Sequence, residues 1–372
     1  MSRKADGKHS SRTDKHSEKA RIKRRWHWGT FGHFLTIFFT FILAIVVLVV
    51  MVLWQFFRGP SQAASDLGVQ TLHQSSALKF VPYLFLFDHT TEALERGETL
   101  SAEGETDASL VTVAFRGKSD TPAENQDGQN TGTDEPADDT GEQFDENGIR
   151  IEEVTGGTYH GYMMIVRDPS RVSVGTCARQ FSTQRSGKRV DEIMQDYGAI
   201  AGMNGGGFYD ANGSGTGGQA EGLVISQGVF LNRASNGYAV VAGFDQDNIL
   251  HVGTFSKDQA EKLGLRDAVA FGPALIVNGQ PSLAADKGLN PRTAIGQRSD
   301  GAVLMLVIDG RQANSMGATL ADVINVMLEF GAVNACNMDG GSSTIMYYGD
   351  KKINDGMTVS VSRRMPTAWI VK

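Results

Sequence analysis

The chain has 372 residues, of which 41% are hydrophobic and 21% charged, and its formal net charge is −7. This composition is that of a globular protein, and its acidic balance argues against nucleic acid as a partner. The averages conceal a basic N-terminal tail, an uncharged apolar run and an acidic remainder.

An uncharged apolar stretch, residues 34–57, predicts a transmembrane helix over residues 33–57. At about 1.5 Å per residue the stretch would reach about 36 Å as a helix, which exceeds the ~30 Å hydrocarbon core of a bilayer. Three tryptophans are placed where an aromatic belt would lie, namely Trp26, Trp28 and Trp54.

The tail before this stretch, residues 1–32, is strongly basic, with ten Lys or Arg against three acidic residues in its first 25 positions. Positive charge beside a span marks the cytoplasmic side, so we expect a single-pass protein of the cell membrane whose chain after Arg58 is extracellular. A cleaved signal peptide is the alternative, with small residues near 62–64. A signal's apolar segment is usually about 7–15 residues long and lies nearer the N-terminus.

Two segments separate the predicted span from the main domain. Residues 58–116 are expected to form a partly helical juxtamembrane segment, in which Pro82 would interrupt any helix. Residues 117–147 carry ten acidic residues against one Lys, with many Gly, Thr, Asn and Gln. Such a composition cannot bury enough apolar surface to offset the entropy of ordering, so it predicts a disordered acidic linker.

Residues 148–372 consist of short apolar runs separated by Gly, Asn and Asp, with long helical patterns only at 188–197 and 318–330. This texture predicts an α+β domain with a mixed, largely antiparallel sheet and a few flanking helices. Two strands are expected on either side of a turn at 168–170. Further strands are expected at 199–204, 222–226, 237–243, 273–277, 292–296, 302–308, 333–338, 343–348 and 367–371.

The two helical patterns belong to a partial internal repeat. Each has apolar residues at the same offsets and runs into a glycine stop, Gly198 or Gly331. Each is followed by a buried strand that ends in a polar residue and two glycines: Asn204-Gly205-Gly206 and Asp339-Gly340-Gly341. Glycines admit close approach of a ligand, so we expect a shared cleft at the two strand ends. A plain hairpin turn is the alternative at Asp339-Gly340.

Charged and hydroxyl side chains that could bind or cleave a substrate occur in the same region of the sequence. They are four carboxylates, two arginines and two serines, namely Asp210, Glu221, Asp309, Asp339, Arg292, Arg311, Ser342 and Ser343. Paired carboxylates suit acid and base roles at a glycosidic centre, and arginines bind phosphate or carboxylate. An ion pair between Asp309 and Arg311 is the structural alternative. Clustered Asp oxygens could also hold a divalent cation, Ca²⁺ or Mg²⁺. Ser315 or Thr319 could cap the second helix.

Other chemistries lack their signatures. There is no G-x-S-x-G for a serine hydrolase and no H-E-x-x-H for a zinc protease. His160 and His251 lie in strand-like segments and are interpreted as structural. Cys177 and Cys336 could form a disulfide or remain free thiols, because two cysteines without a spacing pattern do not define a framework.

Several motifs occur in the order found in phosphodiester glycosidase domains: AIAGMNGGGFYD, FGPALIVNGQ, NPRTAIGQRSDGAVLMLVIDGR and GATLADVINVMLEFGAVNACNMDGGSST. The chain over about 150–372 therefore resembles this NAGPA-like family, and in particular its bacterial branch related to exopolysaccharide biosynthesis. Two positions depart from the pattern, Met338 in place of Leu and Ser342 in place of a third Gly.

The resemblance implies hydrolysis of a sugar-1-phosphodiester in a phosphate-containing cell-surface glycan. It maps the family's motif positions onto Asn204, Gly205, Gly206, Arg292, Asp309, Arg311, Asp339, Gly340, Gly341 and Ser343. From the chemistry of the side chains we expect catalysis by Asp309, Asp339, Arg311 and Arg292. We expect substrate binding by Asn204, Gly205, Gly206, Asp210, Glu221, Gly340, Gly341, Ser342 and Ser343. A non-catalytic glycan-binding or polymer-assembly protein, or a sugar or phosphate transferase, remains the alternative on the same fold.

Overall fold

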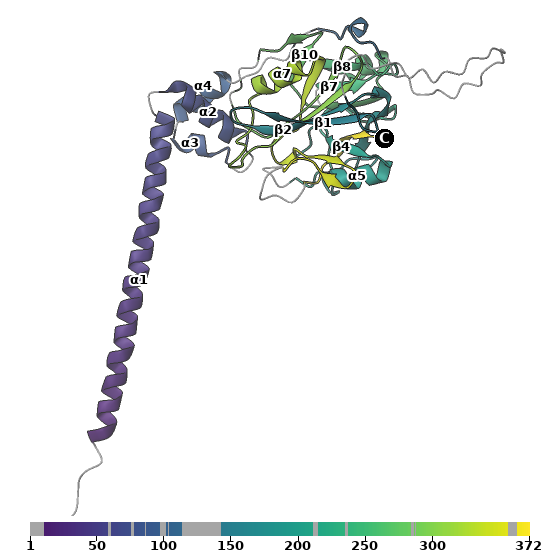
Figure 1. Ribbon diagram of the computed structural model, residues 1–372. Helices are drawn as coiled ribbons and strands as arrows, with labels where there is room; N and C mark the ends of the chain where they lie inside the picture. Colours follow the sequence, from purple (N-terminus) through teal and green to yellow (C-terminus); the bar gives the residue numbers. More distant parts are fainter. Residues whose placement is uncertain are drawn as a thin grey trace, which may run out of the picture. The chain divides into compact units, whose positions relative to one another are not determined.

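The structure is a computed structural model of the chain, and it falls into two compact units, Met1–Pro60 and Ser61–Lys372, which are described separately (Figure 1). It describes residues 11–58, 61–75, 78–85, 87–96, 102, 104–113, 143–210, 215–234, 237–283, 286, 288–355 and 363–372.

The first unit contains one long helix, α1 (Ser11–Arg58). Its segment Phe31–Gln55 has a mean hydropathy of 3.1 and is long and apolar enough to cross a membrane, a test that a signal sequence also passes. The hydroxyls of Thr36 and Thr40 donate to the carbonyls of Gly32 and Thr36, at 2.9 Å and 2.7 Å. These polar groups are therefore satisfied within the helix, as a span through lipid requires.

The second unit begins with three helices, α2 (Gln62–His73), α3 (Val81–Phe85) and α4 (Phe87–Arg96), which pack on one another. The expected partly helical segment is confirmed, but Pro82 does not interrupt a helix. It lies in the first turn of α3, where a missing N–H breaks no helical hydrogen bond. Most of the predicted acidic linker, 117–142, lies outside the described residues.

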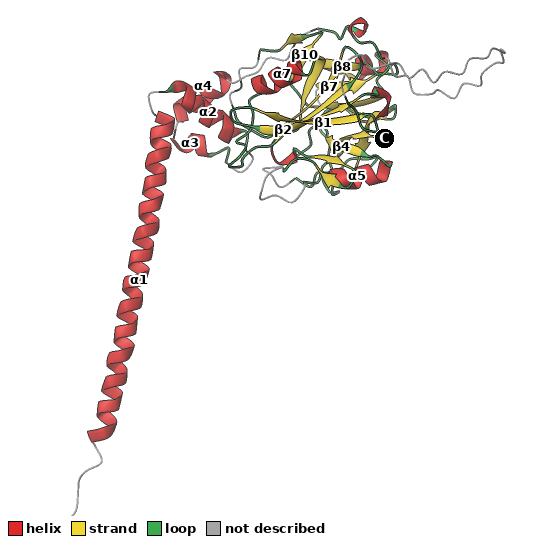
Figure 2. Cartoon of the chain, viewed as in Figure 1, coloured by secondary structure: helices red, strands yellow, loops and turns green. Residues whose placement is uncertain are grey.

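Three sheets form the body of the second unit, and every strand pair described in them is antiparallel (Figure 2). The seven-stranded sheet has the order β1 (Ile149–Thr155), β2 (His160–Val166), β13 (Val303–Ile308), β12 (Arg292–Arg298), β14 (Ala332–Met338), β10 (Ala274–Val277) and β11 (Gln280–Pro281). One five-stranded sheet has the order β16 (Lys351–Lys352), β15 (Met346–Tyr348), β4 (Ala201–Asn204), β17 (Thr367–Val371) and β3 (Val172–Thr176). The other has the order β6 (Val229–Asn232), β5 (Val224–Ser226), β9 (Asp267–Ala270), β7 (Tyr238–Phe244) and β8 (Leu250–Ser256). The α+β class is confirmed.

The alternation of side chains along the strands builds the core in layers. Met164, Met305 and Trp369 belong to a central cluster shared by all three sheets. The opposite face of the seven-stranded sheet is covered by α7 (Leu320–Glu329). A second cluster of buried apolar side chains, which includes Met163 of β2 and Met327 of α7, fills the space between this sheet and the helix. Helices α5 (Val190–Tyr197) and α6 (Lys257–Lys262) cover the outer faces of the two smaller sheets.

Trp369 stands at the centre of the core. Its side chain is fully buried, and its ring meets that of Phe244 edge to face, with centroids 5.7 Å apart. Its indole Nε1 donates to the sulfur of Met338 at 3.3 Å. The last strand of the chain is thereby packed directly under the end of β14.

The internal repeat is confirmed at the level of helix, stop and strand. Gly198 and Gly331 both have positive φ, 63° and 82°, so both stops use the left-handed conformation that glycine favours. Thr319 caps α7, accepting from the N–H of Asp322 at 3.1 Å. The repeat's two strands lie in different sheets, yet their ends meet: the amide Nδ2 of Asn204 donates to the carbonyl of Asp339 at 2.5 Å.

One local expectation is corrected. The predicted strand 343–348 begins only at Met346, because Gly341–Ser343 form a 3₁₀ turn. The two strands expected on either side of the turn at 168–170 are confirmed, and they belong to different sheets. Both cysteines are free, and Cys336 is fully buried in β14, where burial raises the pKa of its thiol.

Candidate active site

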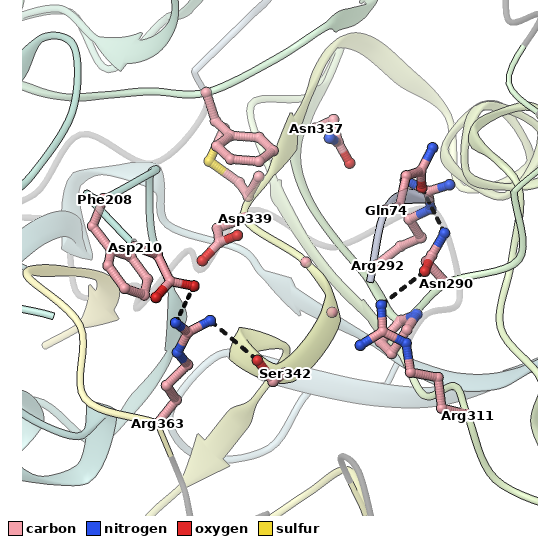
Figure 3. A pocket seen from close by; sticks show the side chains of 15 residues that line it. Gln74, Phe208, Asp210, Asn290, Arg292, Arg311, Asn337, Asp339, Ser342 and Arg363 are labelled. Atoms are coloured by element: carbon pink, nitrogen blue, oxygen red, sulfur yellow. Dashed lines mark hydrogen bonds and ion pairs between the residues drawn. The ribbon is translucent and has the colours of Figure 1, made fainter. Parts of the chain in front are cut away.

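A cavity of about 310 Å³ opens where central strands of the seven-stranded sheet end. Strands β13 and β14 end there and the antiparallel strand β12 begins there, so residues from distant parts of the chain meet at these strand ends. Of the predicted site residues, seven line this cavity: Asp210, Arg292, Arg311, Asp339, Gly340, Gly341 and Ser342 (Figure 3).

Arg292 forms part of the cavity wall from a buried position at the start of β12. Its Nη2 donates to Asp286 Oδ2 and to the carbonyl of Gly288, both at 2.8 Å, and its Nε donates to the carbonyl of Ala318 at 3.0 Å. Burial lowers the pKa of its guanidinium, and the charge of Asp286 opposes that effect. These contacts hold the cation rigidly in place.

Arg311 stands beside it, just after β13, with a φ of 58° that is uncommon outside glycine. Its Nη2 donates to Asn290 Oδ1 at 2.9 Å. Burial lowers the pKa of Arg311, and the positive charge of Arg292 lowers it further. The charges of the two arginines therefore interact, and two neighbouring guanidinium groups on one side of a cavity are suited to binding an anion.

Asp339 occupies the other side of the cavity, directly after β14. Desolvation raises its pKa to about 6, and the charge of Asp210 adds to the rise. The Ser343 hydroxyl, Arg363 and the backbone N–H of Gly340 act in the opposite direction. A carboxyl group with such a pKa can take up and release a proton near neutral pH.

A third arginine, Arg363, lines the acidic side of the cavity and was not predicted. It forms an ion pair with Asp210, donates through Nη1 to Ser342 Oγ at 3.1 Å and stacks over the ring of Phe208 at 4.8 Å. Asp210 also accepts from the N–H of Gly215 at 2.7 Å. The Arg363-Arg364 pair just before the last strand was the only signal available in the sequence.

The first polar-Gly-Gly motif supports the cavity from behind. Asn204 Oδ1 accepts from Thr293 Oγ1 at 2.9 Å, while its amide holds the carbonyl of Asp339. Gly205 accepts from the N–H of Asp339 at 3.3 Å. Asn204, Gly205, Gly206 and Ser343 are not part of the cavity lining. Their placement indicates a role in fixing Asp339.

Two predicted acidic residues lie away from the cavity. The buried carboxylate of Asp309 accepts from Asn354 Nδ2 at 2.8 Å and from the N–H of Asp355 at 3.1 Å. Glu221 is exposed. The structure therefore does not gather the four predicted carboxylates.

The predicted divalent cation depends on such a gathering. Among the described residues, no group of three or more His, Cys, Asp or Glu is placed to hold a metal ion. Asp210 is engaged by Arg363, and Asp309 by the 354–355 turn. The parts of the chain that the structure describes therefore do not supply the ligands of the predicted cation site.

The chain is similar in sequence to known proteins. Residues 197–372 match the NAGPA family, described as phosphodiester glycosidase. The SPbeta prophage-derived uncharacterized protein YomE of Bacillus subtilis is 34% identical over 158 residues, which span 39% of this chain and 24% of that protein. The match thus spans about a quarter of that relative's length.

Solved structures to which the chain is similar include the catalytic domain of zebrafish N-acetylglucosamine-1-phosphodiester α-N-acetylglucosaminidase, at 21% identity and a TM-score of 0.49, covering 60% of this chain and 81% of that one. A hypothetical protein from Synechocystis has 16% identity and a TM-score of 0.44, covering 60% of this chain and 61% of that one. The family match supports a glycosidase-type function for residues 197–372.

Proposed function

We propose that the domain from about residue 148 to the C-terminus hydrolyses a sugar-1-phosphodiester to a free sugar and a phosphomonoester. The observation that carries the proposal is the polarity of one cavity. Asp339 and Asp210 lie on one side of it and Arg292 and Arg311 on the other (Figure 3). This polarity matches a substrate that is anionic at its phosphate and electron-poor at the adjacent sugar carbon.

The arginine side binds the phosphodiester in this proposal. The second pKa of a phosphomonoester is about 6, so phosphate is a good leaving group that needs no proton when two arginines hold its charge. The bond that breaks joins the anomeric carbon to the phosphate oxygen, and its electron pair stays on the phosphate.

Asp339 then acts as the general base. With a pKa of about 6 it is largely ionised at pH 7 to 8. It removes a proton from the water whose oxygen attacks the anomeric carbon. Asp210, paired with Arg363, shapes the sugar end and raises the pKa of Asp339 through its charge. Asp309 holds the 354–355 segment rather than contacting the substrate.

The proposed location is the cell membrane. Segment Phe31–Gln55 would form the span, with the basic tail in the cytoplasm and the catalytic domain outside. The substrate would then be a phosphate-containing cell-surface or exopolysaccharide-type glycan.

The test uses the full chain in detergent with a panel of nucleoside diphosphate sugars and alkyl sugar-1-phosphodiesters. We expect release of free sugar by the wild type and by Asp350→Asn, which changes an exposed aspartate. Asp339→Asn should lose that activity. If no substrate is turned over and Asp339→Ala binds glycan as the wild type does, the domain is a glycan-binding protein. A product formed only with an added sugar acceptor would identify a transferase.

A further inference from the structure

One wall of the cavity comes from outside the region that the family match covers. Gln74 lines the cavity and is the C-cap residue of α2. The family match covers residues 197–372, so α2 lies outside the matched region.

Gln74 bridges the partners of the two arginines. Its Nε2 donates to Asp286 Oδ2 at 2.9 Å, and its Oε1 accepts from Asn290 Nδ2 at 2.5 Å. Asp286 Oδ2 is the acceptor for Arg292, and Asn290 Oδ1 is the acceptor for Arg311. A continuous chain of hydrogen bonds therefore runs from one guanidinium to the other through the Gln74 amide, and its part from Gln74 through Asn290 to Arg311 is drawn on the right of Figure 3.

The helix that carries Gln74 is seated on the loop between these partners. The N–H of Leu289 donates to Thr71 Oγ1 at 3.0 Å. A Cβ on Gly288 would lie 3.2 Å from the backbone carbon of Gln70, so the loop packs directly on α2. Gln70 in turn donates to the carbonyl of Ala93 at 2.8 Å, which fixes α2 to α4.

The Gln amide suits both of its partners at this position. The site requires a donor toward the carboxylate of Asp286 and an acceptor toward the amide of Asn290, and Gln offers both without charge. A Glu at position 74 would repel Asp286, and a Met would make neither bond. Two neighbouring cations repel one another. When the protein fixes their geometry beforehand, the free-energy cost of bringing them together is not charged to anion binding.

We propose that Gln74 is a positioning residue that holds Arg292 and Arg311 as one binding site for the phosphoryl group of the substrate. This inference rests on the proposed function for the identity of the anion. The N-terminal helical segment is on this account a working part of the site, not only a spacer.

The test compares Gln74→Met, which keeps the size of the side chain and loses both hydrogen bonds, with Gln62→Met, which changes an exposed Gln of the same helix. Glucose 1-phosphate is titrated calorimetrically into the full chain in detergent. We expect at least tenfold weaker binding for Gln74→Met and unchanged binding for Gln62→Met. With a hydrolysed substrate, KM should rise more than kcat falls, which a general loss of structure would not produce.

Equal binding of glucose 1-phosphate by Gln74→Met and the wild type would overturn the proposal. If Gln74→Met lowers the Tm by more than 5 °C, the decision passes to Gln74→Glu, which should bind glucose 1-phosphate even more weakly. If both variants unfold, Gln74 is a folding residue and the proposal is also overturned. Binding by the wild type without turnover of any diester would refute the proposed hydrolysis alone, because this titration needs no catalysis.

Discussion

Asp339 combines a proton-transfer pKa with a place opposite two arginines, so its charge should control the rate. We predict that Asp339→Asn lowers kcat by about 10²–10⁴-fold while the domain stays folded. In the wild type, kcat/KM should rise through about pH 6, where the base loses its proton. The pH profile of sugar release measures this. A rate that falls above pH 6 would make Asp339 an acid instead.

The same raised pKa should cost stability. An ordinary aspartate titrates near 3.8, and Asp339 titrates at about 6 in the folded chain. Between these pH values the folded state binds more protons than the unfolded state, so stability falls as pH rises through this window. Asp339→Asn should therefore raise the free energy of unfolding at pH 7.5, by on the order of 1–3 kcal/mol.

Thermal unfolding at two pH values tests this expectation. The gain from Asp339→Asn should shrink toward zero at about pH 3, below the unfolded pKa of 3.8, where the wild-type carboxyl is mostly protonated in both states. The matched change Asp350→Asn, at an exposed position, should show no such pH-dependent gain. A gain of equal size at both pH values would mean that packing, rather than charge, is responsible.

At the scale of the element, the glycines after β4 are required by close backbone packing. A Cβ on Gly206 would lie 2.5 Å from the carbonyl oxygen of Ala270. Gly206→Ala should therefore cost about 1–3 kcal/mol and lower the Tm by about 2–10 °C.

Calorimetry of Gly206→Ala beside Gly157→Ala tests this claim. A Cβ on Gly157 meets nothing within 4 Å, so this control should unfold like the wild type. Equal unfolding temperatures for both variants would show that β4 and β9 can move apart freely.

The elements that could be predicted from sequence are those whose signal is local. The repeat of helix, glycine and strand is visible in the apolar spacing, and it correctly predicted that the ends carrying Asn204 and Asp339 meet. The position of Asp309 at a strand end was equally visible, but a strand end does not determine which way a side chain turns. Here the carboxylate turns to Asn354 and Asp355.

The parts that could not be predicted depend on long-range contacts. Asn290 and Gln74 are 216 positions apart, and no pattern in either segment points to the other. Strand β9 is only four residues long and begins with a buried acid, Asp267, which no apolar alternation reveals. Its carboxylate accepts from the N–H of Val174 at 2.9 Å and so bridges two sheets.

At the scale of the whole molecule, the apolar segment of α1 should hold the chain in a membrane. A charge at the centre of a span costs about 2.5–3.5 kcal/mol, whereas an arginine near the end reaches the interface. The double change Ile42→Arg and Val46→Arg should therefore release chain into the alkaline carbonate extract, and Gln55→Arg should not.

Protease treatment of intact cells tests the predicted orientation. Trypsin should remove the domain after residue 143 and leave an N-terminal epitope protected inside. Protection of the domain instead would reverse the orientation and place the cavity in the cytoplasm.

The burial of Trp369 has an optical consequence. The chain contains four tryptophans, and the other three, Trp26, Trp28 and Trp54, belong to α1. With those three changed to Phe, the tryptophan fluorescence of the chain comes from a single indole. This indole is hydrogen-bonded to the sulfur of Met338, the residue directly before Asp339. The protein thus carries an intrinsic emission probe one residue from its proposed base.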